Sequence, residues 1–276
     1  MANITAADVS KLRQMTGAGM MDCKKALVEA EGDFERAKDL IRERGLAIAN
    51  KRADREASEG AVLAKNNKNN NVAVLIALNC ETDFVAKNQD FVALAQTILD
   101  IALENLPQNL DSLKALKING KTIEDVVIER SGITGEKIEL AFYGKLEAPM
   151  VSSYIHMGNK LATIVGFNKV IADAQIGVNV AMQIAAMNPV AVDTNSVPEE
   201  VKAKEFEIGR ELARNEGKAE NMLDKIAEGR VQKFLKESTL LNQEFVQEGK
   251  ITVRDYLKRT DKDLTVTEFI RFGLNY

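Results

Sequence analysis

The segment Val72–Cys80, with the sequence VAVLIALNC, decides the fold of this chain. Its first seven residues are all apolar, as expected for a central strand that is buried on both faces under helices. A second strand-like run, Gly60–Lys65, precedes it across the polar turn Asn66–Asn71. The two runs predict a hairpin, and a helix with a regular apolar stripe follows from about Asn88.

The same order of elements recurs further along the chain. A strand over Met150–Met157, a Gly158-Asn159 turn and a strand over Lys160–Lys169 lead into a helix from about Ala174 to Met187. This weak internal repeat predicts the α+β class, with a core of two similar subdomains over residues 60–147 and 148–276. Each subdomain is expected to be an antiparallel sheet with helices packed against it, and a strand over Leu264–Phe272 closes the second.

A three-helix domain is predicted over residues 1–45. Three short amphipathic helices are separated by glycines, and we expect them to end at Gly17, Gly32 and Gly45. Residues 46–59 are rich in alanine and charge and lack a wide apolar stripe, so they are predicted to be a linker that is partly helical at most.

A helical hairpin is predicted as an insertion in the second subdomain, over about residues 197–237. Gly217 separates two highly charged helical segments, and their apolar positions could face each other. The expected facing positions are Val201, Ile208 and Leu212 on one side and Leu223, Ile226 and Phe234 on the other. The pattern leaves two arrangements open: a projecting hairpin, or two helices lying flat on the core.

The composition argues against nucleic acid and membrane as partners. Lys and Arg number 37 against 41 Asp and Glu, a net charge of −4, and there is no tryptophan for base stacking. No apolar run approaches the length of a membrane span, and Met1–Thr5 does not begin a signal peptide. Cys23 and Cys80 form no CxxC motif and are interpreted as reduced thiols, so we expect a cytoplasmic protein.

The residue types for common enzyme and metal chemistry are scarce. One histidine, His156, and two separated cysteines cannot build the usual zinc site, and neither phosphate-binding glycine motif occurs. We therefore predict no catalytic residues, no metal and no cofactor, and a protein that is not an enzyme. The competing hypothesis is an enzyme that uses carboxylates such as Glu81 and Asp83.

The segment Thr82–Val85 lies where the buried strand ends and a helix is about to begin. Thr82 is expected to cap a short turn, and side chains there project from a rigid support, which suits recognition. Phe84 is either packed in the local core or a protruding wedge. The frequency with which phenylalanine is buried favours the core interpretation for an arbitrary phenylalanine.

Met20 and Met21 occupy adjacent helical positions. Their side chains point about 100° apart, so both cannot sit well in a small core, and we expect one to be exposed as an adaptable contact. The alternative is that both pack against the next domain. His156, beside Gly158, is predicted at a hairpin tip, without a partner for acid–base catalysis.

Two long motifs resemble the bacterial elongation factor Ts family. They are Thr16–Leu27, TGAGMMDCKKAL, and Asn79–Lys87, NCETDFVAK, and the segments Glu228–Phe234 and Phe269–Phe272 are also similar to the family. The resemblance covers essentially the whole chain. It implies an N-terminal three-helix domain of the ubiquitin-associated type, a two-part core and a helical hairpin inserted in the second part.

The resemblance implies a translation factor of the cytoplasm, a guanine-nucleotide exchange factor that promotes GDP release from elongation factor Tu. The partner would be bound both with GDP and without nucleotide. The family inserts one segment beside the partner's magnesium site and touches the GTPase domain with others. The matching residues here are Thr82, Asp83, Phe84 and Val85 for the first contact, and Arg13, Met20, Met21 and His156 for the second.

Two further expectations accompany the resemblance. Family members often carry an additional C-terminal helix that contacts the partner, whereas this chain stops at Tyr276, directly after its last predicted strand. The helical hairpin is also a candidate contact for a homodimer. The alternative to exchange activity is an adaptor protein that uses the three-helix domain to hold a partner without releasing its nucleotide.

Overall fold

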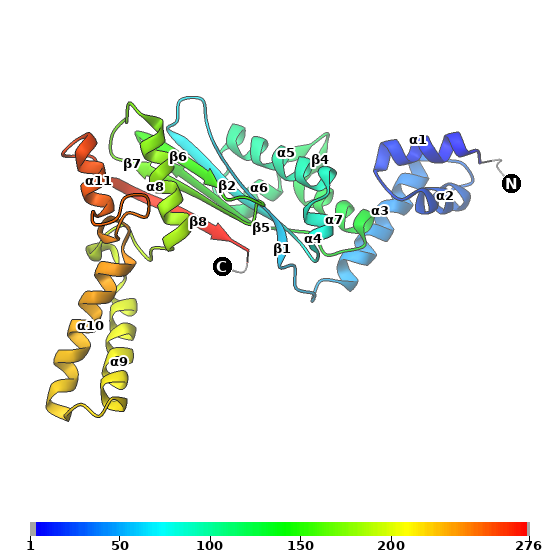
Figure 1. Ribbon diagram of the computed structural model, residues 1–276. Coiled ribbons are helices and arrows are strands. Elements are labelled where there is room, and N and C mark those ends of the chain that lie inside the picture. The colour runs from blue at the N-terminus through cyan, green and yellow to red at the C-terminus, as the bar shows by residue number, and fades with distance from the viewer. Residues whose placement is uncertain (1–3, 275–276) are drawn as a thin grey trace.

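Two three-stranded antiparallel sheets form the centre of the molecule (Figure 1). The computed structural model describes residues 4–274, so the outermost ends of the first and last predicted domains lie outside the described residues. The predicted α+β class is confirmed. The first sheet has the order β1-β2-β5 and the second β6-β7-β8. The strands are β1 Glu59–Asn66, β2 Val72–Cys80, β5 Glu139–Glu147, β6 Met150–Ile155, β7 Leu161–Phe167 and β8 Val266–Gly273.

The sheets pack face to face, and helices cover their outer faces. Helices of the first unit cover the outer face of the first sheet, and α8 and α11 cover that of the second. The covering helices are α4 Asp83–Ala86, α5 Gln89–Asn105, α6 Leu110–Lys114, α7 Ile123–Thr134, α8 Ala174–Met187 and α11 Val253–Thr260. The short strands β3 Lys117–Ile118 and β4 Lys121–Thr122 pair just before α7.

The apolar segment that suggested a buried strand is β2, the central strand of its sheet. Val74, Ile76 and Leu78 face the helices, whereas Ala73 and Leu75 face the second sheet, because successive side chains point to opposite faces. Helices therefore cover only one face, and the second sheet covers the other. Ala73 and Leu75 belong to the buried cluster that the two sheets share.

The N-terminal helices are α1 Ala6–Thr16, α2 Met20–Glu29 and α3 Phe34–Lys51, and they lie at one end of the elongated molecule (Figure 1). Thr5 caps α1 with a complete capping box, and Gly17 ends it in a left-handed conformation. The prediction that the third helix ends at Gly45 is wrong, because α3 continues to Lys51 and takes up the first part of the predicted linker.

A close helix crossing explains this error. Gly45 faces Gly132 of α7, and a Cβ atom added to Gly132 would lie only 2.3 Å from the Cα atom of Gly45. Both glycines therefore permit close packing rather than ending their helices. Helix α7 likewise runs past Gly132 to Thr134 and ends at Gly135.

Helices α9 Glu199–Asn215 and α10 Leu223–Ser238 project from the other end as an antiparallel pair (Figure 1). Of the two arrangements left open by the sequence, the structure adopts the projecting hairpin. Ile208 and Leu212 are exposed rather than facing α10, which is a correction to the predicted seam. The small residues Gly209 and Ala213 form the close contact instead and turn the larger neighbours outward.

Candidate functional site

The corner after β2 carries an exposed aromatic ring. The Thr82 hydroxyl accepts a hydrogen bond from the Val85 amide at 3.4 Å and caps the short helix α4, as predicted. Phe84 is 83% exposed, so the core interpretation of this ring is wrong. Val85 and Ala86 pack against the core of the first unit, and because they fill the inward face of the turn, Phe84 points outward.

A charged side chain lies next to the ring. Asp83 accepts a hydrogen bond from Lys87 at 2.6 Å, one helical turn away. This hydrogen bond and the nearby charges of Lys87 and Lys160 hold the pKa of Asp83 below its ordinary value. The carboxylate is therefore ionised at neutral pH, and it is committed to a cation rather than available as a proton donor.

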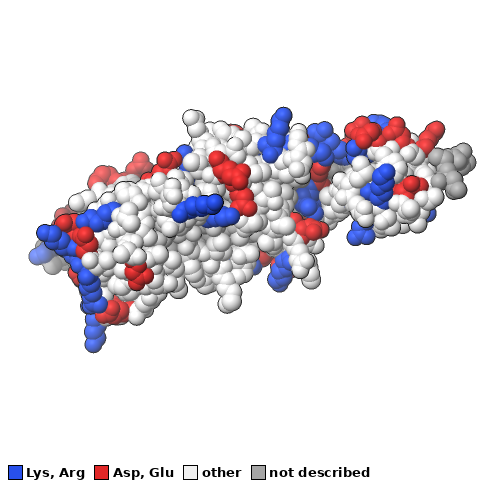
Figure 2. All heavy atoms as spheres, turned by 90° about the horizontal axis from the view of Figure 1, so that it is seen from above, with Lys and Arg blue, Asp and Glu red and all other residues white. Residues whose placement is uncertain are grey.

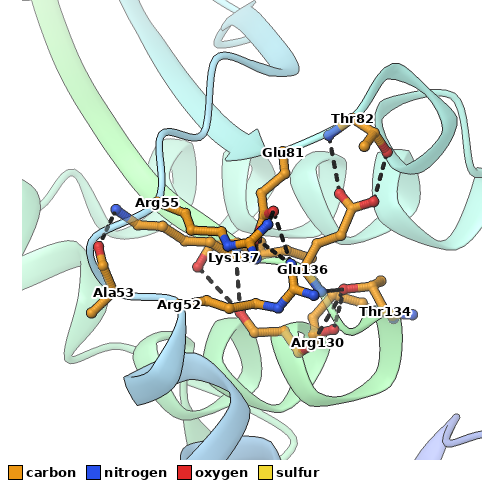
Figure 3. A network of polar contacts seen from close by, with 11 residues as sticks. Arg52, Ala53, Arg55, Glu81, Thr82, Arg130, Thr134, Glu136 and Lys137 are labelled. Carbon is orange, nitrogen blue, oxygen red and sulfur yellow. Dashed lines mark hydrogen bonds and ion pairs between the residues drawn. The ribbon is translucent and has the colours of Figure 1, made fainter.

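The corner is tied to the loop between α7 and β5 by a polar network (Figure 3). Glu136 accepts hydrogen bonds from the Thr82 amide at 3.0 Å and from the Thr82 hydroxyl at 2.6 Å. Glu81 accepts from the Lys137 amide at 2.6 Å and from Arg52, at the end of α3, at 2.8 Å. Figure 3 shows these side chains converging from α3, the corner and the α7–β5 loop.

Glu81 and Cys80 have structural partners that leave little room for enzyme chemistry. Burial alone would raise the pKa of Glu81, but the hydrogen bonds from Lys137 and Arg52 and the charge of Arg55 outweigh it and lower the pKa. Burial, with the charge of Glu136 nearby, raises the pKa of Cys80 to about 12, so the thiol stays protonated and donates to the Thr82 carbonyl. Neither side chain is poised as a base or a nucleophile.

His156 is exposed at the turn between β6 and β7. The hydroxyl of Tyr154 and the His156 Nδ1 atom are 3.0 Å apart. The turn is docked on the first sheet, because the Val62 amide of β1 donates to the Asn159 carbonyl at 2.7 Å. The neighbouring residue Met157 is 90% exposed, and no sequence pattern marked it as a candidate contact.

Lys160 links the two predicted contact elements. Its ammonium group pairs with Glu59 at the start of β1, and its charge also acts on the carboxylate of Asp83. The corner and the His156 turn therefore lie near the same end of β1. No local pattern indicates this proximity, because Lys160 and Glu59 are 101 residues apart.

Arg13, Met20 and Met21 are all exposed, at the end of α1 and the start of α2. The exposed fractions of Met20 and Met21 are 42% and 64%, so both methionines are accessible, where the sequence predicted one. Neither is used to hold the three-helix unit together. The structure thus leaves a flexible, polarizable pair of side chains available for a partner.

On the face shown in Figure 2, acidic and basic side chains are intermingled rather than gathered into one broad basic region. Within residues 4–274, no group of three or more His, Cys, Asp or Glu side chains could hold a metal ion. The same residues contain no helix that is long and apolar enough to cross a bilayer.

The comparisons with known proteins point to one family. The family model for elongation factor TS matches residues 81–275. Proteins described as elongation factor Ts are similar over nearly their full lengths. The protein from Azobacteroides pseudotrichonymphae is 52% identical over 272 residues, covering 99% of this chain and 98% of the relative. The protein from Christiangramia forsetii is 51% identical over 275 residues, covering 99% and 100%, and that from Porphyromonas gingivalis is 50% identical over 273 residues, covering 99% and 98%.

Proposed function

The chain belongs to the elongation factor Ts family and is a translation elongation factor, and we propose that it is the guanine-nucleotide exchange factor of elongation factor Tu. In this proposal it binds the GTPase with GDP, promotes release of the nucleotide and then holds the nucleotide-free form. It works in the cytoplasm, makes and breaks no covalent bond, and needs no cofactor. The observation that carries the proposal is Phe84, exposed on a turn that the rest of the fold holds in place.

The thermodynamic requirement is a coupling between two binding events. A factor that binds the GTPase more tightly without nucleotide must weaken nucleotide binding by the same factor, because coupling free energies are reciprocal. The factor therefore needs contacts that are better in the nucleotide-free conformation of its partner. A rigid wedge beside the magnesium and phosphate site would provide such contacts.

The size of the wedge limits what it can do alone. Burying a phenyl ring contributes about 1.5–3 kcal/mol, which corresponds to about one to two decades in affinity or rate. The ring of Phe84 is almost fully available for such burial. The remaining coupling must come from other contacts, and we assign Arg13, Met20 and Met21 to the GTPase domain and His156 to a contact near the corner.

The test is the rate of GDP release from elongation factor Tu. The GTPase is loaded with a fluorescent GDP analogue and mixed with this chain and excess unlabelled GDP in a stopped-flow instrument. We expect release to accelerate with the concentration of the chain and to reach a plateau. An adaptor would bind the GTPase and leave the release rate unchanged, which would refute the exchange proposal.

Co-purification with elongation factor Tu separates binding from exchange. The complex should persist on size exclusion without nucleotide and dissociate when GDP and magnesium are added together, since both favour the nucleotide-bound form. The same columns, with light scattering, test the proposed homodimer. Ile208 and Leu212 are exposed on the hairpin and are the positions at which a second copy would pack.

A further inference from the structure

The turn that carries Phe84 is held by a residue 54 positions further along the chain. Helix α4 has four residues, far fewer than a helix needs to be stable by itself in water. Its conformation must therefore be imposed by its surroundings. The inward face is packed through Val85 and Ala86, but packing on one side does not fix the first turn. Its N-cap residue, Thr82, contacts the Cys80 thiol through its carbonyl and Glu136 through both its amide and its hydroxyl.

Glu136 binds Thr82 with both carboxylate oxygens. Oε1 accepts from the Thr82 hydroxyl at 2.6 Å, and Oε2 accepts from the Thr82 amide at 3.0 Å. Hydrogen bonds to a carboxylate are short and roughly twice as strong as those between neutral groups, and two together fix direction as well as distance. Glu136 therefore determines both the backbone position and the side-chain rotamer of Thr82.

This contact also determines how Thr82 caps the helix. A hydroxyl has a single proton, and here that proton is donated to Glu136. The oxygen lone pairs are then free to accept from the Val85 amide, which is the hydrogen bond that caps α4. Removing the carboxylate would let the hydroxyl rotate, and the cap would compete with water.

The loop that carries Glu136 is itself fixed by the corner. The carboxylate of Glu81 accepts from the Lys137 amide, while the carboxylate of Glu136 accepts from the Thr82 amide. The corner and the α7–β5 loop thus hold each other through reciprocal hydrogen bonds, in which each segment supplies one carboxylate and one backbone amide (Figure 3). Arg52 adds a third element, because it brings the end of α3 onto Glu81.

We propose that Glu136 is a positioning residue for nucleotide exchange: it keeps the turn folded so that Phe84 is presented to the partner in one orientation. The inference rests on the proposed function, since exchange is what the presentation serves. At 83% exposure the ring has too few contacts of its own to hold its direction, so the direction comes from the backbone. A turn that is loose before binding must be ordered during binding, which weakens the effect of the wedge.

The orientation of the ring can be measured without the partner. The chain has no tryptophan, so Phe84→Trp introduces a single fluorescent reporter at this position. In the otherwise unchanged chain, time-resolved anisotropy should show the indole tumbling mainly with the whole protein. Adding Glu136→Ala should introduce a large nanosecond component. Adding Glu124→Gln, an exposed acid in the first turn of α7, should leave the decay unchanged.

The exchange assay then tests the consequence of this mobility. With Phe84 in place, Glu136→Ala should slow plateau GDP release about tenfold, a loss no larger than that of removing the ring, because Glu136 acts only through the ring. Glu136→Gln keeps one acceptor oxygen and should give an intermediate rate, and Thr82→Val should reproduce the loss. In a Phe84→Ala background, Glu136→Ala should have almost no further effect, because the residue acts through the ring.

The outcomes separate this inference from the proposed function. If the unchanged chain does not accelerate GDP release, the exchange proposal fails, and the anisotropy still decides whether Glu136 fixes the corner. If exchange occurs but Glu136→Ala matches the unchanged chain in anisotropy or in rate, the positioning role is overturned. An equal additional loss in the Phe84→Ala background would also overturn it. Circular dichroism of each variant checks folding, and Glu136→Gln serves if Glu136→Ala unfolds.

Discussion

The two sheets have equivalent corners that are built differently. In each sheet the corner follows the central strand and is held by the segment that leads into the third strand. After β2, Thr82 is held by Glu136, just before β5. After β7, the Asn168 side chain accepts from the Thr265 amide at 2.9 Å and Lys169 pairs with Asp261 at 3.0 Å, just before β8.

The corners also expose different side chains. The first exposes Phe84 on a capped helical turn whose inward residues are packed, whereas the second exposes Val170, at 76%, on a bend without helical structure. The same scaffold thus supports two protrusions, but only one combines a large ring with a hydrogen-bonded turn beneath it. The comparison indicates that a recognition element needs a fixed support as well as an exposed apolar side chain.

The largest expected effect is the difference between Phe84→Ala and Val170→Ala in GDP release. Phe84→Ala should slow release by about ten- to a hundredfold, since the ring can contribute about 1.5–3 kcal/mol when buried. Val170→Ala should leave the rate nearly unchanged. Both residues are exposed, so both melting temperatures should stay close to that of the unchanged chain.

Melting curves identify the source of any loss. A phenylalanine packed in the core would cost the protein about 3–5 kcal/mol of stability on truncation to alanine. A large drop in melting temperature with near-normal exchange would therefore contradict the wedge role of Phe84. Equal losses of exchange for the two variants would instead show that the corners do not differ in function.

The three-helix unit provides the next test, because it lies at the far end from the second corner. Replacing both Met20 and Met21 by alanine should weaken binding to elongation factor Tu roughly tenfold, from the loss of two partly exposed apolar side chains. The concentration of the chain at half-maximal exchange should rise while the plateau rate is retained. Phe84→Ala should instead lower the plateau rate more than it changes the concentration at half-maximal exchange. Normal binding by the double mutant would reassign the methionines to packing.

A smaller, severalfold effect is expected from magnesium. If the first corner acts beside the metal site of the partner, excess magnesium at fixed GDP should lower the population of the binary complex by mass action. The unchanged chain should form more binary complex than Phe84→Ala, and this difference should shrink as the magnesium concentration rises. Val170→Ala should follow the unchanged chain. Titration with fluorescence detection measures each population, and a magnesium-independent equilibrium would remove the metal from the mechanism.

The comparison also shows what local sequence can and cannot predict. The apolar run of β2, the Gly17 turn and the Thr82 cap each act through neighbours in the chain, and each was predicted. For Phe84, the frequency of buried phenylalanines favoured the core, whereas the family resemblance implied an exposed contact. The structure exposes the ring, because Val85 and Ala86 already fill the inward face. The frequency with which phenylalanine is buried takes no account of whether neighbouring side chains already fill the space against the core.

Contacts between distant residues left no local signal. Glu136 and Lys160 reach the corner over long separations, and nothing in the surrounding sequence distinguishes them from other charged surface residues. Gly45 gave a misleading signal, since a glycine that permits a close helix crossing, here with Gly132, looks the same in sequence as one that ends a helix. The candidate contact residues were predicted from family resemblance, but the polar network beneath them was visible only in the structure.

The smallest expected effect concerns the carboxylates that stabilise the two corners. The pKa of Glu81 is lowered from its ordinary value of 4.5, as Lys137 and Arg52 outweigh the effect of burial, and the pKa of Asp261 is lowered by Asp263 and Lys169. A group whose pKa is depressed by folding stabilises the protein above its unfolded pKa and loses this contribution as the pH falls through its folded pKa. Stability should therefore be flat from about pH 7 to pH 5 and fall below about pH 4.5.

Glu81→Gln should lower the free energy of unfolding at pH 7 by about 1–2 kcal/mol, a few degrees in melting temperature. It should also make the loss of stability below about pH 4.5 less steep. Asp261→Asn should have less effect, because the Asp261 side chain is 42% exposed, against 12% for Glu81, and its ion pair is screened by solvent. Urea unfolding of both variants from pH 3.5 to 7 measures the difference. If the free energy of unfolding fell with pH in the same way for both variants, the first corner would be held no more firmly than the second.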